Sequence, residues 1–172
     1  MSKRGFLTYK MGFNLMKKIN KIASFTVDHD LLTEGIYVSR VDGDITTYDL
    51  RTRVPNSGDY MDNLTMHSTE HMFATYIRAG AIGERVVYFG PMGCQTGFYL
   101  LVRDADNVDT LLAVKDALLK IINHTGEMFG AVRRECGNYK NLDLAAAKRE
   151  CARYLEILNG RENDFLYKGD KI

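Results

Sequence analysis

The chain has no tryptophan, 2 prolines and 3 cysteines in 172 residues, and its 23 Lys and Arg nearly balance its 22 Asp and Glu. Three cysteines cannot all pair, so the sequence excludes a disulfide framework and favours a reducing compartment, by default the cytoplasm. A net charge of +1 supplies no field of one sign, which argues against nucleic acid or an anionic membrane as a partner. We therefore expect a small-molecule partner.

Long apolar runs are also missing, because the strongest one, Leu111 to Ile122, is interrupted by charged residues and is shorter than a membrane span. The length suits a single core. We expect one domain over residues 18–172, preceded by an N-terminal extension, 1–17, that is disordered or untranslated. The candidate start residues are Met1, Met11 and Met16.

Hydrophobic periodicity predicts an α+β fold, with helices layered on a mainly antiparallel β-sheet. The strand-like segments are 35–41, 44–54, 84–89 and 97–102, and an Asp42-Gly43 turn joins the first two. The helix-like segments are 62–78, 107–124 with Asn107 as the cap, and 141–160, which opens at Asn141. Cys151 falls on the apolar stripe of the last helix and is predicted to be a core residue. The polar tail from Arg161 is expected to be peripheral.

The densest chemical signal is His67-Ser68-Thr69-Glu70-His71, within the first predicted helix. Offsets of three and four place both imidazoles and the carboxylate on one helix face. Two histidines at i and i+4 can bind one divalent metal, and Glu70 is close enough to act as a general base. An isolated histidine pair more often faces solvent, but H-x-x-E-H is a known metal-site signature, so we favour the metal.

A catalytic metal needs about three protein ligands. Cys136 is the best third candidate, because it lies in a Glu-Cys-Gly-Asn loop and a thiolate suits Zn²⁺ or Fe²⁺. Alone, it would more often be an ordinary half-buried thiol. The competing candidates are His29, His124, Cys94 and several glutamates.

Three further residues could bind or react with a ligand. Cys94 lies in the glycine-rich turn Gly90-Pro91-Met92-Gly93-Cys94-Gln95-Thr96-Gly97, where a thiol can accept or donate a proton, although packing under the turn is an equal alternative. His29 stands between two aspartates, and Arg51 on a strand could hold a ligand carboxylate or hydroxyl. The simpler alternatives are a surface position for His29 and an exposed or paired charge for Arg51.

These segments, in this order, resemble the S-ribosylhomocysteine lyase (LuxS) family over roughly residues 24–158. The motifs that carry the resemblance are Ser24-Phe25 with Asp28-His29, Asp49-Leu50-Arg51, Pro55-Asn56, His67-Ser68-Thr69-Glu70-His71, Gly90-Pro91-Met92-Gly93-Cys94-Gln95-Thr96-Gly97-Phe98-Tyr99, Glu135-Cys136-Gly137-Asn138-Tyr139 and Ala146-Ala147-Lys148. The string around Cys94 is the most specific of them. The chain departs from the family pattern at Tyr88, where many members carry Asp.

The resemblance implies a LuxS or metallohydrolase-like α+β fold and a cytoplasmic homodimer with active sites at the subunit interface. It implies one divalent metal per subunit, natively Fe²⁺, with Zn²⁺ or Co²⁺ as substitutes. The implied ligands are His67, His71 and Cys136. The implied acid and base are Glu70 and Cys94, and the implied substrate-binding residues are Ser24, His29 and Arg51.

The implied reaction cleaves S-ribosylhomocysteine into homocysteine and 4,5-dihydroxy-2,3-pentanedione, the autoinducer-2 precursor, within the activated methyl cycle. Carbonyl migration precedes β-elimination, so no redox cofactor is consumed, and the sequence has no dinucleotide-binding fingerprint. The main alternative is an inverzincin-type metallopeptidase with Glu150 as third ligand, because H-x-x-E-H also marks that class. A metal-binding or dimerising module with a purely structural site is a third possibility.

Overall fold

A computed structural model describes residues 25–168 of the chain. The predicted extension, 1–17, and the predicted substrate-binding residue Ser24 lie outside the described residues.

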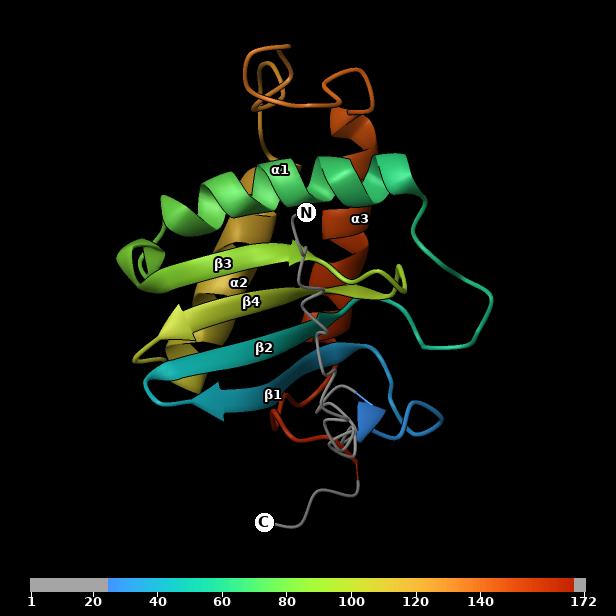
Figure 1. Ribbon diagram of the computed structural model, residues 1–172, viewed down its shortest axis with the longest axis vertical. Helices are drawn as coiled ribbons and strands as arrows, with labels where there is room; N and C mark the ends of the chain where they lie inside the picture. Colours follow the sequence, from blue (N-terminus) through green and yellow to red (C-terminus); the bar gives the residue numbers. More distant parts are fainter. Residues whose placement is uncertain (1–24, 169–172) are drawn as a thin grey trace, which may run out of the picture.

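Four antiparallel strands form one sheet, as expected for an α+β fold (Figure 1). The strands are β1 (Gly35–Asp42), β2 (Ile45–Arg51), β3 (Val86–Pro91) and β4 (Gly97–Arg103), in the spatial order β1-β2-β4-β3. The β1–β2 turn contains Gly43 with φ +62°, as the hairpin signal predicts. The likeness to metallohydrolases stays a prediction.

Of the predicted strands, 84–89 is shifted by two residues to Val86–Pro91, and 44–54 is shorter in the structure. β3 begins at Val86, because residues before it form the short 3-10 helix η2 (Gly83–Arg85). β2 ends at Arg51, because the backbone N–H groups of Thr52 and Arg53 both donate to the carbonyl of Thr96, at 3.0 Å each. These bonds tie the end of β2 to the turn before β4.

Each of the three long helices begins at an aspartate whose carboxylate accepts a backbone N–H, which stabilises the first turn. They are α1 (Asn63–Arg78), α2 (Asn107–Ile122) and α3 (Leu144–Asn159), with caps Asp62, Asp106 and Asp143. Two predicted starts were therefore wrong. Asn107 instead accepts a hydrogen bond from the Tyr48 hydroxyl, and the Asn141 side chain donates to Asn63.

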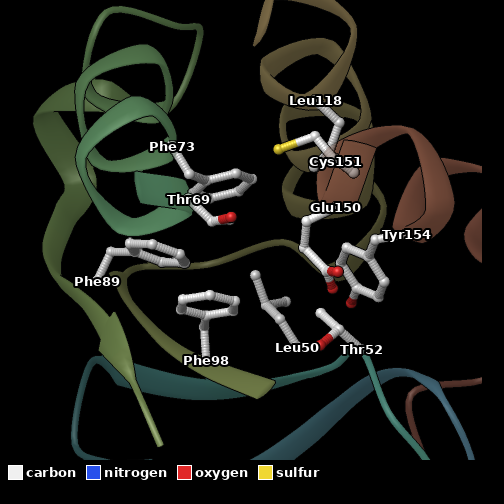
Figure 2. Close-up of a pocket in the computed structure, with 10 residues that line it drawn as sticks. All are labelled: Leu50, Thr52, Thr69, Phe73, Phe89, Phe98, Leu118, Glu150, Cys151 and Tyr154. Carbon is white, nitrogen blue, oxygen red and sulfur yellow. The ribbon is translucent and has the colours of Figure 1, made fainter. Parts of the chain in front are cut away.

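The core lies between the sheet and the helices. In Figure 1, α2 and α3 lie behind the sheet and α1 runs along its β3 side. Figure 2 shows side chains from α1, α2, α3 and the strands meeting around a small internal cavity. Cys151 is fully buried there, which confirms that it is a core residue.

The tail after α3 is not peripheral, and that prediction was wrong. Phe165 and Tyr167 are buried, and the Phe165 carbonyl accepts the backbone N–H of Val38 in β1 at 2.8 Å. The Tyr167 ring stacks on Tyr37 with a centroid separation of 5.0 Å. Two aromatic residues in a polar segment thus anchor it to the sheet edge. Across residues 25–168, no helix combines the length and apolarity needed to span a bilayer.

Candidate metal centre and proton-transfer groups

One group of potential metal ligands combines α1 with a distant loop. His67 and His71 lie one turn apart on α1, and Cys136 comes from the segment between α2 and α3. One potential ligand atom from each of the three lies within 4.8 Å of the others, and the Cys136 sulfur is 3.4 Å from His67 Nε2. The structure therefore brings together the three predicted ligands.

Backbone carbonyls fix the orientation of both imidazoles. His67 Nδ1 lies 2.8 Å from the Asn141 carbonyl oxygen, and His71 Nδ1 lies 3.0 Å from that of Phe129. A carbonyl can only accept, so each Nδ1 carries the proton and donates it. In the neutral ring Nε2 then keeps a free lone pair, which is the arrangement that metal-binding histidines use.

The loop that carries Cys136 is tied back to α1. The Asn138 backbone N–H donates to the Cys136 sulfur at 3.3 Å, and the Asp143 N–H donates to Ser68 Oγ at 2.8 Å. The Asn141 side chain adds a hydrogen bond to Asn63 at 2.5 Å. These contacts hold the thiol over the histidine face of α1, although Cys136 is far from that helix in the sequence.

The donor set fits a divalent transition metal. Tetrahedral bonds of about 2.0 Å to nitrogen and 2.3 Å to sulfur place the two nitrogens roughly 3.3 Å apart and each nitrogen roughly 3.5 Å from the sulfur. The observed separations, up to 4.8 Å, need only a small contraction. Two imidazoles and one thiolate suit Zn²⁺ or Fe²⁺ better than Mg²⁺ or Ca²⁺, which prefer oxygen ligands.

Glu70 lies between the two histidines in the sequence and is half-buried. It lines an open hollow of about 330 Å³ together with His71, Phe129, Gly130 and Glu135. Within the part of the chain that the structure describes, no hydrogen bond or ion pair holds its carboxylate. The Glu70 carboxylate therefore faces the hollow beside His71 without a competing partner among residues 25–168.

A second group of polar residues surrounds Cys94, which is exposed in the turn between β3 and β4. Its sulfur lies 3.0 Å from Thr96 Oγ1 and 3.9 Å from Arg51 Nη1, and that Nη1 also donates to Thr96 Oγ1. Arg51 is only 3% exposed. An exposed position is thus excluded for Arg51, whereas the other predicted alternative, a paired charge, agrees with its ion pair to Asp49.

Arg51 is held by a buried carboxylate. Arg51 Nη2 donates to Asp49 Oδ2 at 2.6 Å, and the same oxygen accepts the Tyr167 hydroxyl at 2.9 Å. Burial acts against the guanidinium charge, but Asp49 outweighs it and raises the pKa of Arg51 above its ordinary value. Burial raises the pKa of Tyr167 far above the usual range, so its hydroxyl remains a donor. With His29 and Tyr99, these residues line one small recess.

The two groups occupy different places on one chain. The hydrogen bonds of the Cys94 group run among β2, the β3–β4 turn and the C-terminal segment, and none of them reaches His67, His71 or Cys136. His29 belongs to the Cys94 group, with its Nδ1 3.0 Å from the Val27 carbonyl.

Glu150, the alternative third ligand, points elsewhere. It is 4% exposed and forms two hydrogen bonds of 2.6 Å with Arg53. Figure 2 shows its carboxylate directed toward Thr52 and Tyr154 at the sheet. The metallopeptidase alternative needs Glu150 beside the two histidines, so the structure contradicts it. His124, another competitor, contacts Tyr76 and the Glu127 carbonyl.

Several supporting groups were not predicted from the sequence. Asp49 could have been found, because residues at i and i+2 on a strand share a face and Asp49 stands two before Arg51. Tyr167 had no such signal, since its contact depends on the path of the tail. The carbonyls of Phe129 and Asn141 had none either, because every residue carries a carbonyl.

Comparison with known proteins agrees with this geometry. The family model described as S-Ribosylhomocysteinase (LuxS) matches residues 22–164. A protein of Borreliella burgdorferi named S-ribosylhomocysteine lyase is 42% identical over 154 residues, covering 86% of this chain and 98% of its own. Proteins of the same name from Finegoldia magna and Phocaeicola vulgatus are 41% and 42% identical over 153 residues each. They cover 86% and 85% of this chain, and 97% and 95% of their own.

Proposed function

The chain belongs to the S-ribosylhomocysteinase (LuxS) family of carbon–sulfur lyases, and from this we propose that it cleaves the thioether of S-ribosyl-L-homocysteine. The products are L-homocysteine and 4,5-dihydroxy-2,3-pentanedione. The observation that carries the proposal is the convergence of His67, His71 and Cys136 beside Glu70, whose carboxylate has no hydrogen-bond or ion-pair partner within residues 25–168. These groups can hold a Lewis acid and move a proton at one place.

The ligand group would hold one divalent metal, with Fe²⁺ as the native ion and Zn²⁺ or Co²⁺ as substitutes. When bound, such a metal supplies Lewis-acid stabilisation of negative charge on a carbonyl oxygen. The chain's own contribution is to orient the donors. The Asn141 and Phe129 carbonyls keep both Nε2 atoms available, and the Asn138 N–H supports the sulfur.

The chemistry requires proton transfers between neighbouring carbons. The sugar begins with its carbonyl at C1, whereas sulfur is bonded to C5, so no acidic C–H flanks the carbon–sulfur bond. Two isomerisations bring the carbonyl to C3, each removing a proton from one carbon and returning it to the next. Loss of the C4 proton then expels the thiolate from C5. Neither water nor a redox cofactor is consumed.

We assign these transfers to Glu70 and Cys94, whose side chains can both accept and donate a proton. The Glu70 carboxylate carries no competing partner among residues 25–168. The Cys94 thiol is exposed, and Thr96 and Arg51 lie against its sulfur. Arg51, with His29 and Ser24, would bind the polar groups of the substrate, because a charged guanidinium pairs with carboxylates and hydroxyls.

The active form would be a homodimer with its sites between subunits. Glu70 and the ligand group lie on the α1 side, whereas Cys94 and Arg51 lie around β2 and the β3–β4 turn. A second copy would place the Cys94 group of one subunit against the ligand group of the other. The half-exposed Val87 and Tyr88 on neighbouring β3 supply apolar surface that such a contact would bury.

Subunit mixing tests this arrangement. Cys94→Ala and Cys136→Ala should each be inactive as pure proteins. Random exchange in an equal mixture makes half of the dimers mixed. In each mixed dimer, one of the two sites combines an intact Cys94 with an intact Cys136, so the mixture should recover about a quarter of wild-type activity. Absence of recovery after verified subunit exchange would contradict a site shared in this way.

We place the enzyme in the cytoplasm, because the three cysteines are free thiols in the structure. The dione would serve as the autoinducer-2 precursor for quorum sensing, and homocysteine would return to the activated methyl cycle.

Thiol release tests the proposed activity. Metal-loaded protein is given S-ribosylhomocysteine, and the new thiol is titrated with a chromogenic disulfide. Glu70→Gln and Cys94→Ala should lose at least about 100-fold in rate, in the range typical of lost acid–base groups. Glu156 is an exposed glutamate on α3. Glu156→Gln makes the same carboxylate-to-amide change away from the site, so this matched control should retain the full rate. No thiol above the buffer background from wild type would refute the proposal.

A further inference from the structure

The loop beside His71 contains a glycine in unusually close contact with that histidine. Gly130 has φ +69°, a backbone conformation that favours glycine. A Cβ at this position would lie 2.6 Å from His71 Nδ1 and 2.9 Å from Cε1. Side-chain carbons do not approach an imidazole this closely, so any other residue here would displace either the ring or the loop.

The carbonyl just before Gly130 makes the hydrogen bond that orients the ring. Phe129 O accepts from His71 Nδ1 at 3.0 Å. This bond draws the loop against the imidazole. The loop and the ring that would clash are thus the same two parts that the hydrogen bond joins. A residue with a side chain at position 130 could avoid the clash only by lengthening this hydrogen bond.

The loop is also fixed from its other side. The Phe129 ring packs edge-on against Tyr76 of α1 and against His124, with centroid distances of 5.4 and 5.0 Å. His124 Nε2 donates to the Glu127 carbonyl at 2.9 Å, so in the neutral ring the Tyr76 hydroxyl donates to Nδ1, at 2.7 Å. This anchored loop leaves His71 as the part that must move.

We propose that Gly130 is a positioning residue for the metal centre. Its missing side chain lets the Phe129 carbonyl hold the His71 imidazole with Nε2 facing His67 and Cys136. Gly130 acts through His71 and does not contact the metal. The inference rests on the proposed function only in taking His71 as a metal ligand, and it does not depend on the substrate.

The test compares Gly130→Ala with Gly43→Ala by cobalt binding. Gly43 has φ +62° and no heavy atom within 4 Å of a built Cβ, so its substitution brings the same backbone strain without a clash. Co²⁺ affinity is measured by competition with a chelator, and its absorption bands report the ligand geometry. Gly130→Ala should bind Co²⁺ about 10- to 100-fold more weakly, as second-shell substitutions do, with altered bands. Gly43→Ala should match wild type.

A double-mutant cycle in metal-free protein provides a second measurement. Gly130→Ala should raise the equilibrium constant for unfolding in both backgrounds. The increase should be roughly tenfold larger in wild type than in His71→Ala, where the opposing ring is gone. If Gly130→Ala fails to fold but the double variant with His71→Ala folds, that result also supports the proposal, because removing the ring removes the clash. Unchanged Co²⁺ affinity, equal losses in the two glycine variants, or no coupling to His71 would overturn it. Lyase activity enters none of these readouts, so failure of the proposed reaction would be seen separately.

Discussion

Replacing Glu150 should damage stability and spare metal binding. The carboxylate is 4% exposed and bonds both Nη atoms of Arg53 at 2.6 Å. Removing one partner of a buried ion pair costs about 3–5 kcal/mol, because the remaining charge is left without compensation. Asp59 still lies 3.2 Å from Arg53 Nε, so we expect Glu150→Ala to cost near the lower end, about 3 kcal/mol.

A loss of this size corresponds to a fall in Tm of about 6–12 °C for a chain of this length. Urea unfolding of the metal-free protein measures the stability, and Co²⁺ titration with chelator competition measures the affinity. Glu156→Ala, on the exposed side of the same helix, is the control and should change stability by less than about 0.5 kcal/mol.

Cys136→Ala should show the reverse pattern, losing metal affinity with a smaller change in stability. Two results would contradict the structural role of Glu150: a loss of metal affinity in Glu150→Ala like that in Cys136→Ala, or a stability of Glu150→Ala equal to that of Glu156→Ala. The first outcome would restore the metallopeptidase arrangement of ligands, and the second would show that the buried pair contributes nothing.

Three further outcomes follow from the same contacts. In native metal-free protein, a disulfide reagent should modify the exposed Cys94 rapidly and the fully buried Cys151 only after denaturation, which mass spectrometry of the labelled peptides would check. Burial raises the pKa of Cys151 well above its usual range, so the thiol stays protonated in the folded protein while it ionises in the unfolded chain. The free energy of unfolding is therefore unaffected below the unfolded-state pKa and falls as the pH rises above it. Between pH 8 and 9.5 the expected fall is about 1.3 kcal/mol. Urea unfolding at the two pH values should show this loss in wild type, and Cys151→Ala should lack it. Tyr167→Phe should cost about 1–3 kcal/mol, because its hydroxyl donates to the buried Asp49; an unchanged urea midpoint would contradict that contribution.

The sequence predicted most of the fold because local patterns carry it. Alternation and the Asp-Gly turn identified the β1–β2 hairpin, and the spacing of α1 was correct from its aspartate cap onward. The start of α3 was misplaced because Asn141 forms its bonds with α1, which no local pattern shows. The tail was misjudged for the same reason, since Tyr167 gains its partner from β2.

The ligand group was predictable in part. The two histidines share a face through helical spacing alone, so the sequence was enough to pair them. Cys136 lies in a separate loop, and its approach to His67 depends on the path of the chain between α2 and α3. The supporting carbonyl of Phe129 and the space at Gly130 required coordinates, because neither leaves a pattern in the sequence.

Elimination leaves a different sugar product from hydrolysis, so the identity of that product tests the proposed cleavage of S-ribosylhomocysteine. Metal-loaded protein is incubated with S-ribosylhomocysteine without any redox cofactor, the products are trapped with an aromatic 1,2-diamine, and they are analysed by mass spectrometry. We expect the quinoxaline of 4,5-dihydroxy-2,3-pentanedione in a one-to-one ratio with homocysteine. Free ribose in its place would indicate hydrolysis, and intact substrate would indicate no lyase activity; either result would overturn the proposed reaction.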